Sequence, residues 1–261
     1  MTIPIELVDH ILSFLRPDKT LEICSTVFPQ LADKHLYSHI ILCSGRCGYV
    51  EEFYWPKFLD FIYQVNQRPN ILLFVKNIQI IIFTVPAPNF LPIISKLLPK
   101  FSKLRSIDLQ GWGPFSWDDL KPDFSTAFQK CLRFPLINKV SISNIDYFPL
   151  DLFDNCHNLK KLCLGGHFTG VCTSSYPPLS SLRIDIPLHT IESPTYLPKI
   201  VSWMNSRTLQ SLSLCIDQSI DLQPLIEACS PTLLTLDLDI SYDGEYRSIL
   251  FKTQLLIGFA S

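Results

Sequence analysis

Histidine and cysteine residues near the N-terminus have a spacing that could suit a metal ion. They are His35, His39, Cys43 and Cys47, each four residues after the one before. Imidazole and thiolate groups are zinc ligands, and only a helix would bring all four side chains to one face at this spacing. The segment from His39 to Leu42 reads as a strand, in which a step of four residues covers about 13 Å. We therefore expect no zinc site there.

A second candidate metal site lies near the C-terminus. It consists of Asp237, Asp239, Asp243 and Gly244, which resemble part of a calcium loop. The glycine is displaced from the position that an EF-hand requires, and polar strand positions followed by a turn explain these residues better. The sequence thus predicts neither a metal ion nor another cofactor.

The chain lacks the short motifs that identify common active sites. No Gly-x-Ser-x-Gly, P-loop or Gly-x-Gly-x-x-Gly sequence is present. The histidines have no nearby Cys or Ser in the context of a catalytic triad, and an enzyme with a spatially assembled site stays an alternative. The sequence favours a protein that does no chemistry itself.

Composition narrows the possible partners and the compartment. The net charge is -2 and no cluster of Lys and Arg occurs, so nothing indicates nucleic-acid binding. Nine cysteines, an odd number, are scattered along the chain, which is typical of free thiols in a reducing compartment. The longest apolar run, Ile71 to Phe83, is too short to span a bilayer. We expect an intracellular protein, cytoplasmic or nuclear, without a membrane partner.

The first fifteen residues predict a helix with an unusually wide apolar face. Pro4 suits its first turn, and Arg16-Pro17 ends it. Its apolar residues are Ile5, Leu7, Val8, Ile11, Leu12, Phe14 and Leu15. At about 100° per residue they fill an arc of about 180°, whereas a surface helix needs a stripe only somewhat wider than about 100°. This helix therefore needs two neighbours, of which the second may be another protein.

Further helical segments and a short strand complete a unit of residues 1–42. Asp18 or Thr20 can cap a second helix, which carries apolar residues from Leu21 to Val27, and the apolar pattern continues to Leu36. Tyr37 to Leu42 reads as a strand. A unit of about 40 residues is near the lower limit for folding alone.

Three segments of this unit resemble, in order, an F-box in the style of fungal F-box proteins. They are Ile3 to Leu15, Asp18 to Val27 and Ala32 to Tyr37. The resemblance implies binding to the Skp-type adaptor of an SCF ubiquitin ligase, a complex built on a cullin. Pro4, Ile5 and Leu7 match the adaptor-contacting start, and the same helix would add Val8, Ile11 and Leu12.

One departure from the F-box pattern lies after the middle segment. Val27 runs directly into Phe28-Pro29, as if about three residues were missing, and Phe28 takes the place of the usual aromatic residue. The alternative is that residues 1–42 form only a helical cap on the domain behind them.

An apolar pattern recurs along the rest of the chain, where one apolar residue is followed three residues later by a second and two later by a third. The instances are Val75/Ile78/Ile80, Leu104/Ile107/Leu109, Ile137/Val140/Ile142, Leu159/Leu162/Leu164, Leu179/Leu182/Ile184, Leu209/Leu212/Leu214 and Leu233/Leu236/Leu238. Their central residues are 29, 33, 22, 20, 30 and 24 residues apart, in or near the period of leucine-rich repeats. Each pattern predicts a strand whose last two apolar residues point inward.

Four segments between these strands read as helices. They are Leu91 to Leu98, Leu150 to Asn155, Leu197 to Asn205 and Leu222 to Cys229. A strand and a helix cannot bury their apolar surfaces alone, so the units must stack. The span from Asp154 to Leu162 also resembles the repeats that follow F-boxes in fungal proteins.

The expected fold is α/β, with a short N-terminal helical F-box followed by a leucine-rich-repeat-like solenoid with a parallel sheet. We divide the chain into the F-box-like motif (1–42), a connecting loop and helix (43–70), and a degenerate repeat domain (71–261). An ordinary α/β domain with a parallel sheet is the alternative. Leu255 to Phe259, after the last expected strand, would be a makeshift cap or the mark of a shortened chain.

The resemblance implies the substrate-recognition subunit of an SCF-type ubiquitin ligase, which holds an unknown target protein on its repeats. The alternative is a repeat-only interaction scaffold whose F-box no longer binds the adaptor. Outward residues of successive strands would line a concave binding surface. Our candidates there are Asp108, Gln110, Arg183, Asp185, Asp237 and Asp239, with Ser141, Ser143, Lys161, Cys163, Ser213 and Cys215 beside them. The competing surface is a loop in which Trp112 and Trp117 flank Gly113-Pro114.

Overall fold

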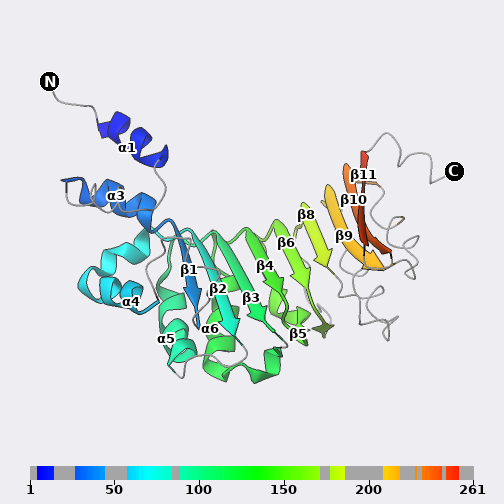
Figure 1. The fold of residues 1–261 in the computed structure, drawn as a ribbon, viewed down its shortest axis with the longest axis horizontal. Coiled ribbons are helices and arrows are strands. Elements are labelled where there is room, and N and C mark those ends of the chain that lie inside the picture. The colour runs from blue at the N-terminus through cyan, green and yellow to red at the C-terminus, as the bar shows by residue number, and fades with distance from the viewer. Residues whose placement is uncertain are drawn as a thin grey trace.

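The computed structural model describes residues 5–14, 27–44, 58–83, 89–113, 115–170, 177–185, 208–217, 227, 231–242 and 245–252. Within these residues the protein is a mixed α/β structure with a long, mostly parallel sheet, and helices gather at its N-terminal end (Figure 1). Several expected features lie outside the described residues. They are Pro4, all but Val27 of the second expected helix, Leu197 to Asn205, all but Glu227 of Leu222 to Cys229, and Leu255 to Phe259.

Three α-helices lie among the described residues of the N-terminal end. They are α1 (Ile5–Phe14), α3 (Pro29–Leu36) and α4 (Phe58–Gln67), and α4 is followed by the 3-10 helix η1 (Pro69–Leu73). The α4 helix lies within segment 43–70, where the sequence predicts a connecting loop and helix, and it ends just before Arg68-Pro69. Proline disfavours helical geometry in the residue before it, which explains this end.

Eight parallel strands and one antiparallel strand form the main sheet. In spatial order they are β1 (His39–Cys43), β2 (Asn77–Phe83), β3 (Ser106–Trp112), β4 (Lys139–Ser143), β6 (Lys161–Gly165), β8 (Ser181–Asp185), β9 (Ser211–Asp217), β10 (Thr235–Tyr242) and β11 (Glu245–Lys252). Among the described strands, only β11 pairs antiparallel, and its partner is β10. The order in space is the order in the chain. The strand expected at Tyr37 to Leu42 is β1, so the sheet begins inside segment 1–42 and not at residue 71.

A strand occurs at each of the seven expected apolar triplets, and the last two residues of each triplet are buried in it. The first residue of each triplet, such as Val75, Leu104 and Leu159, is also buried, just before its strand. The two inward residues pair with their equivalents on the next strand, as Leu162 does with Leu182. The pairing aligns the apolar side chains into continuous buried rows.

A repeated hydrogen-bond fork fixes the offset between successive strands. The carbonyl oxygen of Lys76 accepts hydrogen bonds from the backbone N–H groups of Arg105 (2.7 Å) and Ser106 (3.1 Å). The same fork recurs at Arg105 and, further along, at four more carbonyl groups, those of Asn138, Lys160, Ser180 and Gln210. Each unit therefore starts at the same level as the unit before it.

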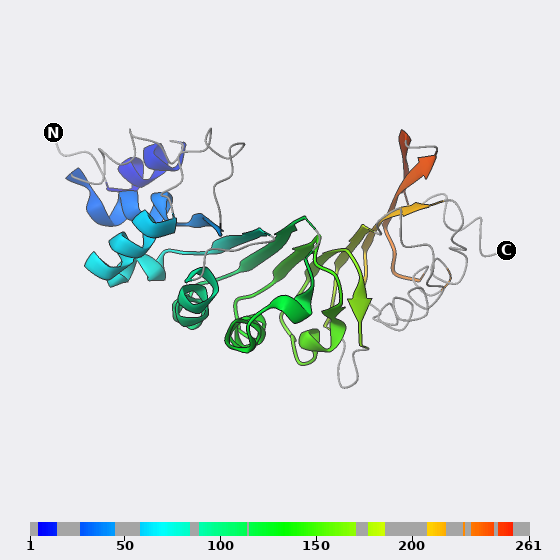
Figure 2. The same cartoon turned by 60° about the horizontal axis from the view of Figure 1, so that its bottom comes forward.

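Two helices cover one face of the sheet. Figure 2 shows α5 (Phe90–Leu97) and α6 (Pro122–Leu132) on the same side, where their buried residues join those of the strands in one core. Pro122 suits the first turn of α6, where its missing N–H costs nothing. The α6 helix was not expected, although its buried residues Phe124, Ala127, Phe128, Cys131 and Leu132 have helical spacing.

Other parts of the fold differ from expectation. The helix expected at Leu150 to Asn155 is the shorter 3-10 helix η4 (Leu150–Phe153). A separate pair of two-residue strands, β5 (Phe148–Pro149) and β7 (Phe168–Thr169), and the antiparallel β11 were not expected either. Two further 3-10 helices were not expected either. They are η2 (Leu98–Lys100), which follows α5, and η3 (Trp117–Asp119), which precedes α6.

An ion pair joins α3 to the end of α4. Arg68, which follows α4, donates from Nη1 to both carboxylate oxygens of the buried Asp33 on α3, at 3.2 and 3.0 Å. Its Nη2 donates to the Tyr37 hydroxyl (3.3 Å) and to Gln64 Oε1 (3.0 Å). Burial raises the pKa of the Asp33 carboxyl, and Arg68 acts against that rise. Asp33 is thus a buried carboxylate that depends on one partner.

Replacing Leu162 or Leu212 by alanine should lower the free energy of unfolding by about 2–5 kcal/mol, because both side chains are buried in the core. The exposed neighbour Lys161 provides the control, and Lys161→Ala should change stability by no more than about 0.5 kcal/mol. Chemical denaturation measures both. A leucine variant as stable as the control would contradict the inward orientation of that strand.

Arg68→Ala should destabilise the protein by about 1–3 kcal/mol at neutral pH, because it leaves a buried carboxylate without its partner. Without Arg68 the Asp33 pKa rises further. Protonation as the pH falls through this raised pKa removes the buried charge, so the loss of stability should be smaller in mildly acidic buffer than at neutral pH. Adding Asp33→Asn should restore most of the stability at neutral pH. Denaturation curves with an equal loss at both pH values would show that the charge is not the cause.

Candidate protein-interaction surfaces

The apolar face of α1 is divided into a covered stripe and an uncovered one. Val8 (8% exposed) and Leu12 (3%) pack against Ala32 of α3, with Leu31 and Leu36 beside them. Leu7 (49%), Ile11 (51%) and Phe14 (74%) are exposed. At about 100° per residue these three lie within an arc of about 60°, so they form one stripe along the helix.

The remaining adaptor candidates are Ile5, the first residue of α1, and Pro4. Ile5 is 63% exposed, although its direction on the helix matches the covered stripe. Pro4 lies outside the described residues. The structure therefore brings Leu7 and Ile11 together on the exposed stripe, hereafter the α1 stripe (Leu7, Ile11 and Phe14), and assigns Val8 and Leu12 to the contact with α3.

Polar contacts fix the rotation of α1 on α3. Asp9 Oδ2 accepts a hydrogen bond from Lys34 Nζ at 2.7 Å, and Asp9 Oδ1 lies 2.8 Å from His35 Nε2. These contacts hold the pKa of the Asp9 carboxyl below its ordinary value, chiefly through the hydrogen bond from Lys34. They lie on a different side of α1 from the exposed stripe, so they orient it without covering it.

Exposed apolar side chains are concentrated at the N-terminal end. In the described part of the chain thirteen large hydrophobic side chains are exposed, and nine of them precede residue 75. Besides those of α1 they are Val27, Phe28, Leu59, Tyr63 and Leu73. A concentration of this kind is typical of a surface that another molecule covers.

The second surface is the sheet face opposite α5 and α6, here called the polar face. The register places one row of outward residues side by side across the strands. This row contains Gln79, Asp108, Ser141, Cys163, Arg183, Ser213 and Asp237. The next row includes the paired residues Gln110 and Ser143 and, further along, Gly165, Asp185, Cys215 and Asp239. The predicted substrate-binding residues of the strands therefore do share one face.

The charged groups in the C-terminal half of the polar face contact one another. Arg183 Nε donates to the Asp185 carboxylate at 3.0 Å, and Arg183 Nη2 lies 3.9 Å from Asp239 Oδ2. Arg183 is thus already paired with two acidic groups. Nearer the N-terminus, burial raises the pKa of the Asp108 carboxyl above its ordinary value. A hydrogen bond with the Ser141 side chain acts in the opposite direction and lowers this pKa.

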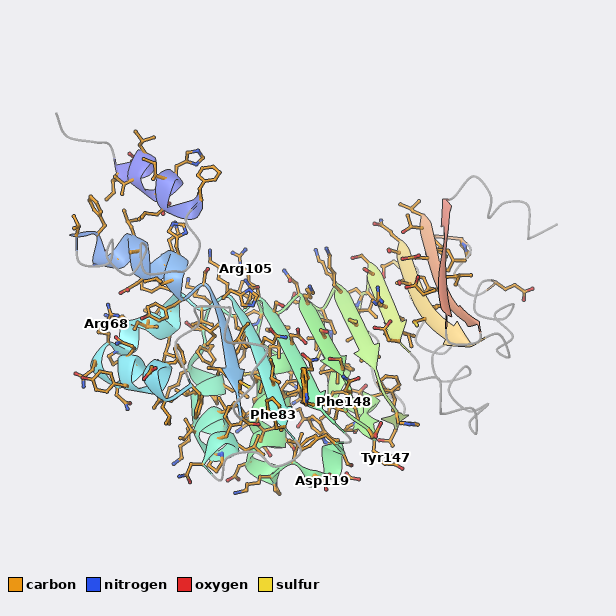
Figure 3. The ribbon with its side chains drawn as sticks, viewed as in Figure 1. Arg68, Phe83, Arg105, Asp119, Tyr147 and Phe148 are labelled. Carbon is orange, nitrogen blue, oxygen red and sulfur yellow. The ribbon has the colours of Figure 1, made fainter. Side chains whose placement is uncertain are left out.

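The two tryptophans of the competing surface have different environments. Trp112 ends β3 and is 45% exposed, and its ring centroid lies 5.7 Å from that of Phe83. Phe83 is labelled near the end of β2 in Figure 3. Trp117 is only 7% exposed and packs against Phe128 and Phe148 at 5.8 and 4.7 Å. Trp117 therefore does not contribute to an exposed loop surface, because Phe128 and Phe148, which are distant in the sequence, enclose its ring. Trp112 is the accessible residue of the pair.

The residues weighed as metal ligands are not brought together. His35 contacts Asp9, whereas His39 and Cys43 lie at opposite ends of β1, and Cys47 lies outside the described residues. Asp243 and Gly244 are also outside them. Over the part of the chain that the structure describes, no three His, Cys, Asp or Glu side chains could hold a metal ion together. None of the described helices is long and apolar enough to cross a membrane.

The buried thiols have structural partners. Cys131 Sγ donates to the Leu98 carbonyl at 3.2 Å and Cys156 Sγ to the Leu152 carbonyl at 3.7 Å. Burial raises the pKa of Cys131 to about 12 and that of Cys156 to about 11, so both are neutral thiols at physiological pH. Cys163 and Cys215 are only half-buried and lie on the polar face, at the outward strand positions predicted for them.

Sequence reasoning missed a groove at the starting edge of the strands on the polar face. It has a volume of about 580 Å³, and four cationic residues line it: Arg105, Lys139, Lys160 and Lys161. Arg105 is labelled at this edge in Figure 3. The available signal was a lysine at the first position of two expected strands, at Lys139 and Lys161. It becomes a cluster only when the strands pair in register.

Two surfaces of this chain are candidates for contact with other molecules: the α1 stripe at one end, and the polar face with its groove along the sheet. Both consist of groups suited to contact, apolar in the first case and polar or charged in the second. No family model matches this chain, and no curated protein or solved structure matches it either.

Proposed function

We propose that this protein is the substrate-recognition subunit of an SCF-type ubiquitin ligase. The α1 stripe binds the Skp-type adaptor, and the polar face of the sheet holds a target protein. The observation that carries the proposal is the exposed stripe Leu7, Ile11 and Phe14 on a helix whose other apolar side is already covered. The F-box resemblance of the segments around it supplies the identity of the adaptor.

The energetics of α1 support an external partner. Fully burying one large aliphatic or aromatic side chain contributes about 1.5–3 kcal/mol relative to leaving it exposed. Three such side chains form one stripe, and they are 49–74% exposed. A partner that covers them gains this free energy without rearranging α1, because Asp9 and its contacts to Lys34 and His35 already fix the helix.

The sheet supports the second half of the proposal. Strictly sequential strands, each offset by the same carbonyl fork, favour a leucine-rich-repeat-like solenoid over a doubly wound sheet, in which the strand order reverses. Helices α5 and α6 lie on one face only (Figure 2). The aligned outward rows then provide an extended surface for a protein target, and this role requires no catalytic step from the chain.

A repeat-only scaffold is the second candidate function. The observation that favours it is the short route from Val27 to α3, which begins at Pro29 and has eight residues. Val27 and Phe28 are both exposed, so the aromatic residue of this segment does not complete the packing of the helices. In this alternative the shortened F-box has lost its adaptor, and the polar face still binds a target.

Leu7→Asp should weaken binding to the Skp-type adaptor at least about 100-fold. A carboxylate placed in a desolvated apolar contact costs several kcal/mol, and each 1.4 kcal/mol is about tenfold in affinity. Isothermal titration calorimetry with purified adaptor gives the affinities. Thermal melting should show an unchanged sheet, because Leu7 is exposed and not part of the core.

Ser13→Asp is the matched control, since it adds the same charge to an exposed polar position about 120° away on α1. It should leave the adaptor affinity within about threefold. Equal effects of the two variants would contradict the assigned stripe. A wild-type chain that does not bind the adaptor at micromolar concentration would overturn the main proposal in favour of the scaffold.

A further inference from the structure

The groove at the starting edge of the strands concentrates positive charge in a chain whose net charge is negative. Arg105, Lys139, Lys160 and Lys161 line it, and Asp108 is the one carboxylate among its described lining residues. In the described part of the chain none of the four cationic groups makes an ion pair. The Asp108 carboxylate lies near enough to Lys139 for each to affect the other electrostatically. The groove therefore holds an excess of three positive charges.

Histidine does not change this balance at neutral pH. His39 lines the groove at its β1 end, and burial is the main reason that its pKa is below the ordinary value. Asp108 raises that pKa and Lys139 lowers it, with the burial effect dominating. His39 is therefore neutral near pH 7 and adds hydrogen-bonding capacity instead of charge.

The register explains why the charges gather. Lys139 and Lys161 are 22 residues apart in the chain, but they pair directly at the start of β4 and β6. Arg105 and Lys160 immediately precede β3 and β6, and their carbonyl groups form two of the hydrogen-bond forks. Adjacent strands are about 4.8 Å apart, so the cationic groups follow one another along a line across the sheet.

The rest of the lining suits a peptide backbone. Asn77, Gln79 and Asn138 carry amide groups, while Ser106, Ser141 and Ser180 carry hydroxyl groups, and all six line the groove. Amides and hydroxyls both donate and accept hydrogen bonds, as peptide groups require. The groove runs from β1 to β8, five strand steps or about 24 Å, which an extended segment of about seven or eight residues covers.

We propose that this groove binds a carboxylate-rich, extended segment of the target protein. The inference rests on the proposed function and names the chemistry of its target. Rows of glutamate or aspartate side chains would meet Arg105, Lys139, Lys160 and Lys161, while the peptide groups bind the amides and hydroxyls beside them. Unpaired cations at an open surface are attractive to an anionic segment and steer its approach.

The charges beyond the groove favour an acidic peptide over a nucleic acid. The polar face continues toward the strand ends with Asp185, Asp237 and Asp239, which would repel a long phosphate backbone. None of the described lining residues is a Phe, Tyr or Trp on which bases could stack. A short acidic segment fits within the groove and ends before this acidic region.

Fluorescence anisotropy with the full chain tests the proposal. The probe is a labelled eight-residue peptide with four glutamates, and its partner probe carries four glutamines at the same positions. The glutamate peptide should bind at least about tenfold more tightly at about 0.05 M salt, and raising the salt to about 0.5 M should remove most of the difference. Equal binding of the two peptides would overturn the proposal.

Matched variants locate the site. Lys139→Glu with Lys161→Glu should reduce affinity for the glutamate peptide at least tenfold. Lys96→Glu with Lys130→Glu changes the net charge equally on the exposed surfaces of α5 and α6, and should reduce it by less than threefold. If a thermal melt shows that the first pair does not fold, Lys139→Ala with Lys161→Ala replaces it. This alanine pair should then reduce peptide affinity more than the control pair does. Equal losses for both pairs would contradict the groove.

Two further probes decide between ligand classes. If only a peptide with phosphoserines in place of the glutamates binds, the carboxylate assignment is wrong. It is also wrong if a uracil oligonucleotide binds more tightly than the glutamate peptide. Adaptor binding through α1 is measured separately on the same variants. Intact adaptor binding without peptide binding refutes only the target chemistry, whereas the reverse result refutes only the adaptor.

Discussion

The carbonyl fork before each strand is the constraint on which the structure depends. One backbone oxygen accepts hydrogen bonds from two successive N–H groups of the next unit, from Lys76 through Gln210. Buried peptide groups must be paired, so a unit that slipped by one residue would lose these bonds and turn its leucines outward. The fork therefore sets both which side chains enter the core and which ones share a row on the surface.

This constraint separates stability from recognition. Inward positions such as Leu162 and Leu212 are confined to apolar residues by burial. Outward positions have no such restriction, and they vary from Asp108 to Arg183 along one row. Binding properties can therefore change along the polar face while the core that supports it stays the same. This division does not hold in the N-terminal helices, because α1 carries apolar residues on both its covered and its exposed sides.

Local periodicity made the strands predictable from sequence. Triplets such as Leu159/Leu162/Leu164 contain their own evidence, because a strand buried on one face needs apolar residues two apart. The two stripes of α1 were likewise implied by an apolar arc too wide for one neighbour. The β11 strand could not be found this way, since Glu245–Lys252 lacks the triplet and its pairing with β10 depends on a turn, not on a repeat.

Features formed by distant residues were not predictable in the same way. Trp117 is buried by Phe128 and Phe148, and nothing in its own neighbourhood of the sequence reports those contacts. The cationic groove needs the register between β4 and β6 before Lys139 and Lys161 become neighbours. Asp33 and Arg68 are 35 residues apart, and their pairing depends on where α3 and α4 meet. The sequence contains these groups, but only the fold determines their distances.

The sequential strand order relates the position of a bound segment along the sheet to its distance from α1. Because each strand adds about 4.8 Å, a segment bound one strand further along lies one such increment further from α1, and the seven increments from β1 to β10 add up to about 34 Å. An exchange of outward residues between neighbouring strands would shift a bound segment by one strand spacing without altering the core. In a ligase, such a shift would decide which lysine of the target comes within reach of the ubiquitin donor.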